Sequence, residues 1–322
     1  MEYVNLGKTG LKVSRVGLGC MSFGAPDAGG IPGKVSEAEA REIIKYALDA
    51  GINFFDTANY YSLGLSEEIL GRALKDFALR EEVVISTKLY YPMYDGANAK
   101  GLSRKAIFDQ VENSLKRLGT DYIDLYVIHR WDYTTPIEEV MEALNDLVRM
   151  GKVRYIGASS MYAWQFVKAN SIAEKRGWAK FVSMQNTINL IYREEEKEML
   201  PMCLSEGIAV TPYSPIAHGA LTRSPEEFGT SPSSQLQSPY VLEHDREIIK
   251  RTREIATKYQ VSPGQVALAW VYAKPGVTAP LVGGSKIAYV QEAIDAFNLH
   301  LSDEDIAYLE EPYVPHKQYG FR

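Results

Sequence analysis

Short apolar runs rich in β-branched residues alternate with longer amphipathic segments along almost the whole chain. The apolar runs predict eight strands, at about residues 16–20, 52–56, 83–88, 123–128, 153–158, 181–185, 208–212 and 278–282. The segments between them repeat apolar residues at helical spacing and predict helices. Eight strand–helix units without a long polar linker predict an α/β fold, a single (β/α)8 TIM barrel over residues 1–322.

Three helix starts have recognisable capping patterns. Ser36 and Glu39 match a capping box. Ser262 is followed by a proline, which is common at the first position of a helix. Thr135 followed by Pro136 combines a cap with a first-turn proline and predicts a helix beginning there. These patterns fix where three of the outer helices should begin.

Three segments depart from the alternation. The first residues, around Lys8-Thr9-Gly10, predict a β-hairpin at the bottom of the barrel. Pro280 interrupts the eighth strand and leaves its bounds open, because proline cannot donate a ladder hydrogen bond. Residues 216–241 are rich in Ser, Pro and Gly and follow the seventh strand, so they predict a lid loop over cofactor or substrate.

Composition narrows the class of protein. The chain of 322 residues is 46% hydrophobic and 24% charged, as in ordinary globular proteins. Its net charge of −6 does not indicate binding to nucleic acid or to an anionic membrane. No secretory signal and no apolar run of roughly 18 residues is visible, so we expect a cytoplasmic protein. Cys20 and Cys203 are expected to be reduced thiols, and the five histidines match no metal motif, so no metal is expected.

Four ionisable residues carry the candidate chemistry. The predicted strands INFFD, EVVISTK and IDLYVIH end in Asp56, Lys88 and His129, and Tyr61 follows Asp56 in the next loop. Parallel neighbours in one barrel bring their carboxyl ends to the same rim. A phenol beside an ammonium, a carboxylate and an imidazole can protonate a carbonyl oxygen. The pattern therefore predicts carbonyl reduction.

Each of these residues also has a plainer interpretation. Asp56 and Lys88 alone could be a structural ion pair, Tyr61 an ordinary loop aromatic and His129 a structural histidine. In the catalytic interpretation, Lys88 lowers the pKa of Tyr61 from about 10; a decrease of about two units needs roughly 3 kcal/mol. His129 would orient the substrate oxygen when neutral or share in proton delivery when charged.

A hydride donor must accompany such an acid. Residues 17–22 begin like a dinucleotide fingerprint, but Ser22 replaces its last glycine and no helix follows at once. Polar groups at the ends of strands five to seven are better candidates for holding a nicotinamide: Ser159, Ser160, Gln185 and the Tyr213-Ser214-Pro215 run. Residues 283–286, GGSK, lie where barrels often bind phosphate.

At this point the whole chain resembles the aldo-keto reductase superfamily. The motifs are GINFFDTANYY, STK, LYVIH, KVRYIGASS, SMQ, YSPIAHGAL and GGSK, in family order. The resemblance implies a (β/α)8 barrel that binds NADP(H) without a metal, with Asp56, Tyr61, Lys88 and His129 as the catalytic tetrad. It implies cofactor contacts from Cys20, Met21, Asp56, Ser159, Ser160, Gln185, Tyr213, Ser214, Pro215, Ile216, Ala217, Gly219, Leu221, Arg223, Gly283, Ser285, Lys286, Tyr289 and Glu292. A substrate pocket is expected from Met21, Tyr60, His129 and Trp131.

Three positions depart from the family pattern, and they bear on the choice of cofactor. Ser160 and Ala293 stand where asparagine is common, and Tyr289 where arginine or glutamine often serves. NADP(H) is favoured, through Lys286, and NAD(H) is the alternative.

Within the superfamily, HRWDYTTPIEE and NLIYREEEKEMLP look most similar to bacterial reductases of the 1-deoxyxylulose-5-phosphate synthase-like and aryl-alcohol dehydrogenase type. The leading hypothesis is an NAD(P)H-dependent reductase of aldehydes or ketones. One alternative is an enzyme that forms 1-deoxyxylulose 5-phosphate, with Arg130 and Lys286 as candidate phosphate ligands. Another is a nucleotide-binding protein like the potassium-channel subunits of the superfamily, although these carry asparagine where this chain has His129.

Overall fold

A closed barrel of eight parallel strands forms the centre of the molecule. The computed structural model describes residues 1–224 and 241–321. The sheet has the order β10-β3-β4-β5-β6-β7-β8-β9, and β9 and β10 are joined by hydrogen bonds from Thr278 N to Val210 O and from Leu281 N to Pro212 O, both 2.8 Å. The strands are β3 Gly17–Gly19, β4 Phe54–Asp56, β5 Val84–Leu89, β6 Ile123–Ile128, β7 Val153–Ser159, β8 Phe181–Gln185, β9 Ala209–Val210 and β10 Leu281–Gly283. The predicted (β/α)8 barrel is confirmed.

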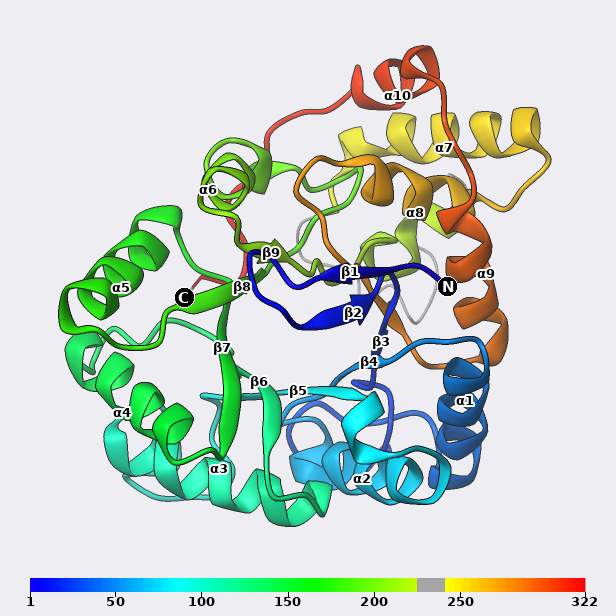
Figure 1. Cartoon of the computed structure of the whole chain (residues 1–322). Coiled ribbons are helices and arrows are strands. Elements are labelled where there is room, and N and C mark those ends of the chain that lie inside the picture. The colour runs from blue at the N-terminus through cyan, green and yellow to red at the C-terminus, as the bar shows by residue number, and fades with distance from the viewer. Residues whose placement is uncertain (225–240, 322) are drawn as a thin grey trace.

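Helices surround this sheet as an outer layer (Figure 1). The ring consists of α1 Glu37–Asp49, α2 Leu65–Phe77, α3 Arg104–Leu118, α4 Ile137–Arg149, α5 Ala163–Arg176, α6 Met199–Glu206, α8 Pro263–Ala273 and α9 Ile287–Phe297. It closes where α9 contacts both α8 and α1. Two further helices, α7 Arg246–Tyr259 and α10 Asp303–Glu310, pack outside α8 and extend the molecule at that edge. None of the described helices is long and apolar enough to cross a membrane.

Local sequence explains two of the three predicted helix starts. Ser36 and Glu39 form the predicted capping box of α1, and Ser262 forms another at α8. The prediction at Thr135 is wrong in detail: α4 begins at Ile137 with Pro136 as its N-cap, and no side chain caps it. Thr135 instead donates its hydroxyl to the carboxylate of Asp132, three residues earlier, at 2.8 Å.

The N-terminal hairpin closes the bottom of the barrel, as predicted. Strands β1 Tyr3–Asn5 and β2 Lys12–Ser14 pair antiparallel and lie across the barrel axis in Figure 1. Leu6 and Val13 are fully buried and pack with apolar residues from the starts of the barrel strands, among them Phe54 and Val84. This apolar plug leaves the opposite, carboxyl-terminal rim for chemistry.

The last two barrel strands are shorter than predicted. β9 covers two residues rather than 208–212, and β10 begins at Leu281 rather than at 278. Pro280 lies just before β10 and serves only as an acceptor, from Gly17 N at 3.0 Å, so its missing N–H breaks no ladder bond. Of the predicted lid loop, residues 217–222 form a 3₁₀ segment, η4 Ala217–Thr222, and residues 225–240 lie outside the described part of the chain.

Candidate active site

Strand ends bring the four predicted residues to one rim. Asp56 is the last residue of β4, Lys88 lies near the end of β5, His129 directly follows β6, and Tyr61 lies in the loop after β4. All four are buried, with exposed fractions between 0% for Lys88 and 7% for Tyr61. The barrel therefore assembles the predicted group from three neighbouring strands.

Asp56 and Lys88 form a fully enclosed ion pair. The Lys88 ammonium donates to Asp56 Oδ1 and to the Thr57 carbonyl oxygen, the latter at 2.8 Å. Asp56 Oδ2 accepts from Ser86 Oγ at 2.8 Å and from Gln185 Nε2 at 3.0 Å. Burial lowers the pKa of Lys88, but the charges of Asp56 and Tyr61 and its hydrogen bonds outweigh burial and raise it. Lys88 is therefore a fixed cation.

The ring of Tyr61 lies beside this cation. Lys88 Nζ is 5.1 Å from the centroid of the Tyr61 ring, and a tight turn with positive φ at Ser62 (49°) and Leu63 (45°) follows it. Burial raises the pKa of Tyr61, and the nearby Lys88 charge only partly opposes this. The sequence interpretation expected a lowered pKa and was wrong in direction, because it left out burial. The Tyr61 hydroxyl thus keeps its proton at neutral pH.

His129 is neutral and has an unused ring nitrogen. Burial, followed by the positive charges of Lys88 and Arg130, lowers its pKa well below the usual value. Its ring meets the ring of Tyr61 edge-on, with centroids 5.9 Å apart. His129 Nδ1 is buried and has no hydrogen-bond partner among the described residues. Buried polar atoms are nearly always paired, so this nitrogen is suited to a ligand atom.

Aromatic rings continue outward from His129. Tyr91 contacts the His129 ring edge-on at 5.0 Å between centroids and stacks on Tyr60 at 4.9 Å. Trp131 pairs with the exposed Trp164 at 6.2 Å. Tyr60 and Trp131 were predicted as pocket residues, whereas Tyr91 and Trp164 were not. The pair Tyr90-Tyr91 directly after β5 was the available sequence signal for Tyr91. Met21, also predicted here, is 40% exposed.

Candidate nicotinamide-holding residues meet on the neighbouring strands. Ser160 Oγ lies 3.1 Å from the hydroxyl of Tyr213 and 3.3 Å from Ser159 Oγ, which joins the ends of β7 and β9. Ser160 has a φ of 48°, a left-handed conformation that is costly outside glycine and concentrates at functional sites. The side-chain amide of Gln185 donates to Asp56 Oδ2, so Gln185 contacts the catalytic group directly.

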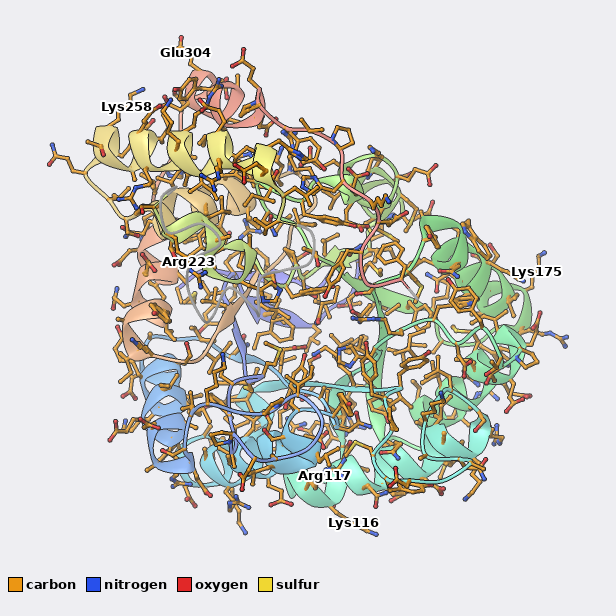
Figure 2. All side chains as sticks on the ribbon, turned by 180° about the vertical axis from the view of Figure 1, so that it is seen from behind. Lys116, Arg117, Lys175, Arg223, Lys258 and Glu304 are labelled. Atoms are coloured by element: carbon orange, nitrogen blue, oxygen red, sulfur yellow. The ribbon has the colours of Figure 1, made fainter. Side chains whose placement is uncertain are left out.

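The chain after Tyr213 winds through further left-handed residues. Positive φ occurs at Ser214 (54°), Ala217 (50°) and His218 (54°), and Ser214 Oγ lies 3.0 Å from His218 Nε2. Pro215, Ala217 and Leu221 are buried, and Ile216 and Gly219 are partly buried. Figure 2 views the molecule from the side opposite to Figure 1. In it Arg223 lies nearer the centre of the molecule than Lys258, Glu304 and Lys175, which lie at the outer edge.

Candidate adenosine-side residues divide into two groups. Gly283 and Lys286 are exposed, and a Cβ at Gly283 would meet no atom within 4 Å. Ser285 is partly exposed, and the Lys286 ammonium lies 5.6 Å from the centroid of the Tyr289 ring. Glu292 instead bonds the Ser262 hydroxyl at the start of α8. The thiol of Cys20 lies in the core, 3.7 Å from the Leu18 carbonyl oxygen, and the residue is fully buried.

Several fungal proteins are similar to this chain over nearly its full length. Versiconal hemiacetal acetate reductase of Aspergillus parasiticus is 45% identical over 98% of this chain and 98% of its own. A Schizosaccharomyces pombe protein provisionally named aryl-alcohol dehydrogenase is 45% identical over 97% of this chain and 96% of its own. A Saccharomyces cerevisiae protein of similar name is 41% identical over 99% and 98%.

These relatives correct one expectation and settle another. All three are fungal, and two are named as aryl-alcohol dehydrogenases. The aryl-alcohol part of the expected likeness is therefore confirmed, whereas its bacterial, 1-deoxyxylulose-5-phosphate part does not describe them. The sequence pattern of the aldo/keto reductase family matches residues 15–313, which include every strand of the barrel and all four buried ionisable residues. The chain therefore belongs to the aldo/keto reductase family and is an oxidoreductase.

Proposed function

We propose that this oxidoreductase reduces an aldehyde or ketone to an alcohol with NAD(P)H and uses Tyr61 as its general acid. The observation that carries the proposal is the position of the Lys88 ammonium. It is bound to the Asp56 carboxylate and lies 5.1 Å from the centroid of the Tyr61 ring. A fixed cation there stabilises the phenolate that forms when the Tyr61 hydroxyl loses its proton.

The side chains divide the work of proton transfer. Tyr61 holds a proton because burial raises its pKa, and it donates this proton to the carbonyl oxygen. Lys88, kept charged by Asp56, gains interaction energy as the phenolate develops, so it stabilises the transition state more than the ground state. Neutral His129 binds the same carbonyl oxygen through a ring N–H and orients the carbonyl group.

A bound dihydronicotinamide supplies the hydride that the carbonyl carbon receives. Two features fit such a group: Ser214 and Ala217 adopt positive φ just after Tyr213, and a Cβ at Gly283 would meet no atom within 4 Å. We assign the carboxamide to Ser159, Ser160 and Gln185, ring stacking to Tyr213, the pyrophosphate to the segment 214–223 and the adenosine to 283–292. We favour NADP(H), because the exposed Lys286 can meet a 2′-phosphate.

The substrate is proposed to be an aromatic carbonyl compound. Tyr60, Tyr91 and Trp131 are partly exposed around His129 and offer flat apolar surfaces. The names of the relatives, an aryl-alcohol dehydrogenase and a versiconal hemiacetal acetate reductase, support this class. Arg130 does not support a sugar phosphate, because it donates to the His129 carbonyl oxygen at 2.6 Å and lies over the ring of Tyr91 at 5.6 Å.

A carbonyl panel with isotopically labelled cofactor tests this function. Aromatic aldehydes, aliphatic aldehydes and pentose phosphates are each incubated with NADPH or NADH deuterated at the nicotinamide C4. We expect deuterium on the carbinol carbon of aromatic alcohols, with higher kcat/KM for NADPH. Oxidation of the cofactor without deuterium in the alcohol contradicts hydride transfer. Conversion of the pentose phosphate in preference to the aldehydes contradicts the substrate assignment.

A further inference from the structure

Two histidines and an aspartate converge away from the catalytic group. His244 and Asp245 lie in the 3₁₀ segment η7 Glu243–Asp245, and His316 lies in the C-terminal tail, 71 residues after Asp245. His316 Nε2 is 3.1 Å from Asp245 Oδ2, and His244 Nε2 is 3.7 Å from Asp245 Oδ1. One ligand atom from each residue lies within 4.8 Å of the others. The spacing along the sequence gives no metal motif, but the fold brings the three together.

Asp245 provides a second, independent observation. Its side chain is fully buried, and Oδ2 accepts from Leu242 N at 2.6 Å as well as facing His316. Oδ1 is also buried but accepts no hydrogen bond from any described residue. A buried carboxylate oxygen without a donor keeps its desolvation penalty uncompensated. The described residues therefore leave room for a further group between Oδ1 and the imidazole of His244.

A divalent transition-metal ion fits this arrangement. Zn²⁺ binds imidazole nitrogen and carboxylate oxygen at about 2.0–2.2 Å, and tetrahedral geometry then separates neighbouring ligand atoms by about 3.4 Å. The imidazole nitrogens of His316 and His244 lie 3.1 and 3.7 Å from the two different oxygens of the Asp245 carboxylate, and one ligand atom from each residue lies within 4.8 Å of the others, so small side-chain rotations bring the three ligand atoms to that separation. A simple ion pair between His316 and Asp245 accounts for the contact at Oδ2. It gives Oδ1 no hydrogen-bond donor among the described residues, and it does not account for the position of His244 beside Oδ1.

We propose that His244, Asp245 and His316 bind one divalent transition-metal ion of the Zn²⁺ type, with water in the fourth position. The ion is structural, because none of the three residues contacts Asp56, Tyr61, Lys88 or His129 in any described interaction. It joins the chain at the start of α7 to the C-terminal tail and satisfies the open carboxylate oxygen.

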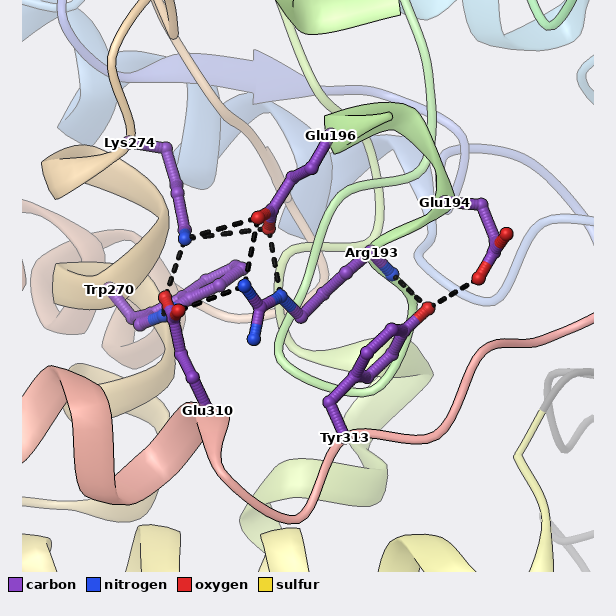
Figure 3. A network of polar contacts seen from close by, with 7 residues as sticks. All are labelled: Arg193, Glu194, Glu196, Trp270, Lys274, Glu310 and Tyr313. Carbon is purple, nitrogen blue, oxygen red and sulfur yellow. Dashed lines mark hydrogen bonds and ion pairs between the residues drawn. The ribbon is translucent and has the colours of Figure 1, made fainter. Parts of the chain in front are cut away.

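The metal would fix a tail that is already held on one side. Tyr313 donates its hydroxyl to Glu194 at 2.7 Å (Figure 3). His316 N donates to the same carboxylate at 2.9 Å. Further along, a Cβ at Gly320 would stand 3.7 Å from both the Tyr213 hydroxyl and the Arg130 guanidinium. Because the tail ends beside the proposed stacking tyrosine, metal binding is expected to order this border of the site.

Metal titration of the whole chain tests the proposal. Protein stripped with a chelator is titrated with Zn²⁺ in competition with a chromophoric chelator, and separately with Co²⁺, whose absorption reports tetrahedral ligation. We expect one tight equivalent, a tetrahedral Co²⁺ spectrum and a higher Tm with metal. His244→Asn and His316→Asn should each weaken binding by at least about tenfold. His300→Asn, which changes an exposed histidine outside the cluster, should leave it unchanged.

Two results overturn the proposal. One is the lack of a stoichiometric Zn²⁺ equivalent in the unaltered chain. The other is undiminished affinity in His244→Asn, which would assign the binding to adventitious surface groups. His244 is the decisive variant because its side chain is 38% exposed and its replacement leaves the buried His316–Asp245 pair in place, so folding is preserved.

Discussion

Gln185 on β8 donates its side-chain amide to Asp56 on β4 across the mouth of the barrel, at 3.0 Å. Three strands separate these two in the sheet order, so the contact spans the barrel rather than joining neighbours. Gln185 is also a residue proposed to hold the nicotinamide carboxamide. One side chain thereby couples cofactor position to the Asp56–Lys88 ion pair, and its loss should affect both.

Gln185→Ala is expected to reduce kcat and to weaken cofactor binding together. A hydrogen bond to a charged group contributes about 1.5–3 kcal/mol, so kcat/KM should fall about tenfold to a hundredfold. Ser86→Ala is the matched control, because Ser86 Oγ donates to the same carboxylate oxygen at 2.8 Å but is not a proposed cofactor residue. Steady-state kinetics and fluorescence titration with NADPH separate the two effects. Equal weakening of NADPH binding in both variants would refute the coupling.

Tyr61→Phe should abolish reduction without loss of cofactor affinity. Proton delivery by a positioned acid contributes about 10²–10⁴-fold, so kcat should fall by at least that range. Tyr126→Phe is the control for removal of a buried hydroxyl: Tyr126 lies on β6, and its hydroxyl has no hydrogen-bond partner among the described residues. Its activity should match the unaltered enzyme. If the Tyr61→Phe enzyme keeps an appreciable kcat, Tyr61 is not the general acid.

Strand ends could be predicted from the sequence because two patterns coincide there. In β4, β5 and β6 an apolar run stops at a residue of functional type, namely Asp56, Lys88 or His129, and parallel strands bring such ends together. The hairpin was predictable because Lys8-Thr9-Gly10 lies between two short extended runs, which pair as β1 and β2. Local periodicity therefore defines both the barrel and the position of its active rim.

Tertiary contacts account for what the sequence did not predict. Asp132 accepts hydrogen bonds from the hydroxyl of Thr135 and from the backbone N–H of Leu102, which lies 30 residues away in another loop. The hydroxyl of Thr135 therefore binds Asp132 instead of capping the helix. The direction of the Tyr61 pKa depends on burial, which no local pattern reports. The pairing of Asp245 with His316 spans 71 residues and has no spacing rule.

Lys88→Met should destabilise the protein more than an ordinary lysine change. It leaves the Asp56 carboxylate buried without its cation, which costs about 3–5 kcal/mol of unfolding free energy. The double variant Lys88→Met/Asp56→Asn should recover part of this loss, because no unpaired charge remains. Urea unfolding checks both. Lys45→Met, in an exposed pair with Asp49, is the control and should change stability by only about 0.5 kcal/mol or less.

The same Lys88→Met change should shift the pH dependence of the reverse reaction. Alcohol oxidation needs the Tyr61 phenolate as base, so its rate rises with pH toward the pKa of Tyr61. Lys88 lowers that pKa against the effect of burial, and its removal should move the rising limb to higher pH. An unshifted limb in a folded variant argues against electrostatic tuning by Lys88.

Lys286→Ala should distinguish the two cofactors. If the exposed Lys286 ammonium meets a 2′-phosphate, its loss weakens NADPH binding by about tenfold, or about 1.4 kcal/mol, and leaves NADH unchanged. Lys175→Ala removes another lysine, at the outer edge of the molecule in Figure 2, and should change neither affinity. Parallel weakening of NADPH and NADH by Lys286→Ala would exclude the phosphate contact.

Glu195 should make the protein less stable as pH rises from acid to neutral. Burial raises its pKa to about 8, while in the unfolded chain it keeps an ordinary value near 4.5. Between these values the folded state binds the extra proton, so stability is fully present below pH 4.5 and falls as pH increases toward 8. The expected slope from this one group is at most about 1.4 kcal/mol per pH unit.

Glu195→Gln should remove that slope, because glutamine stays neutral and can keep a hydrogen bond with the Asn186 amide, which Glu195 Oε2 accepts at 2.6 Å. Urea unfolding at a series of pH values should show the free energy of unfolding of the variant increasing relative to that of the unaltered protein from pH 5 to about pH 8. Above about pH 8 the difference should stay constant. Glu198→Gln, at an exposed position three residues later, should follow the unaltered protein throughout. If the Glu195→Gln and unaltered curves stay parallel over this range, Glu195 is ionised in the folded protein, and an unseen cation must compensate its charge.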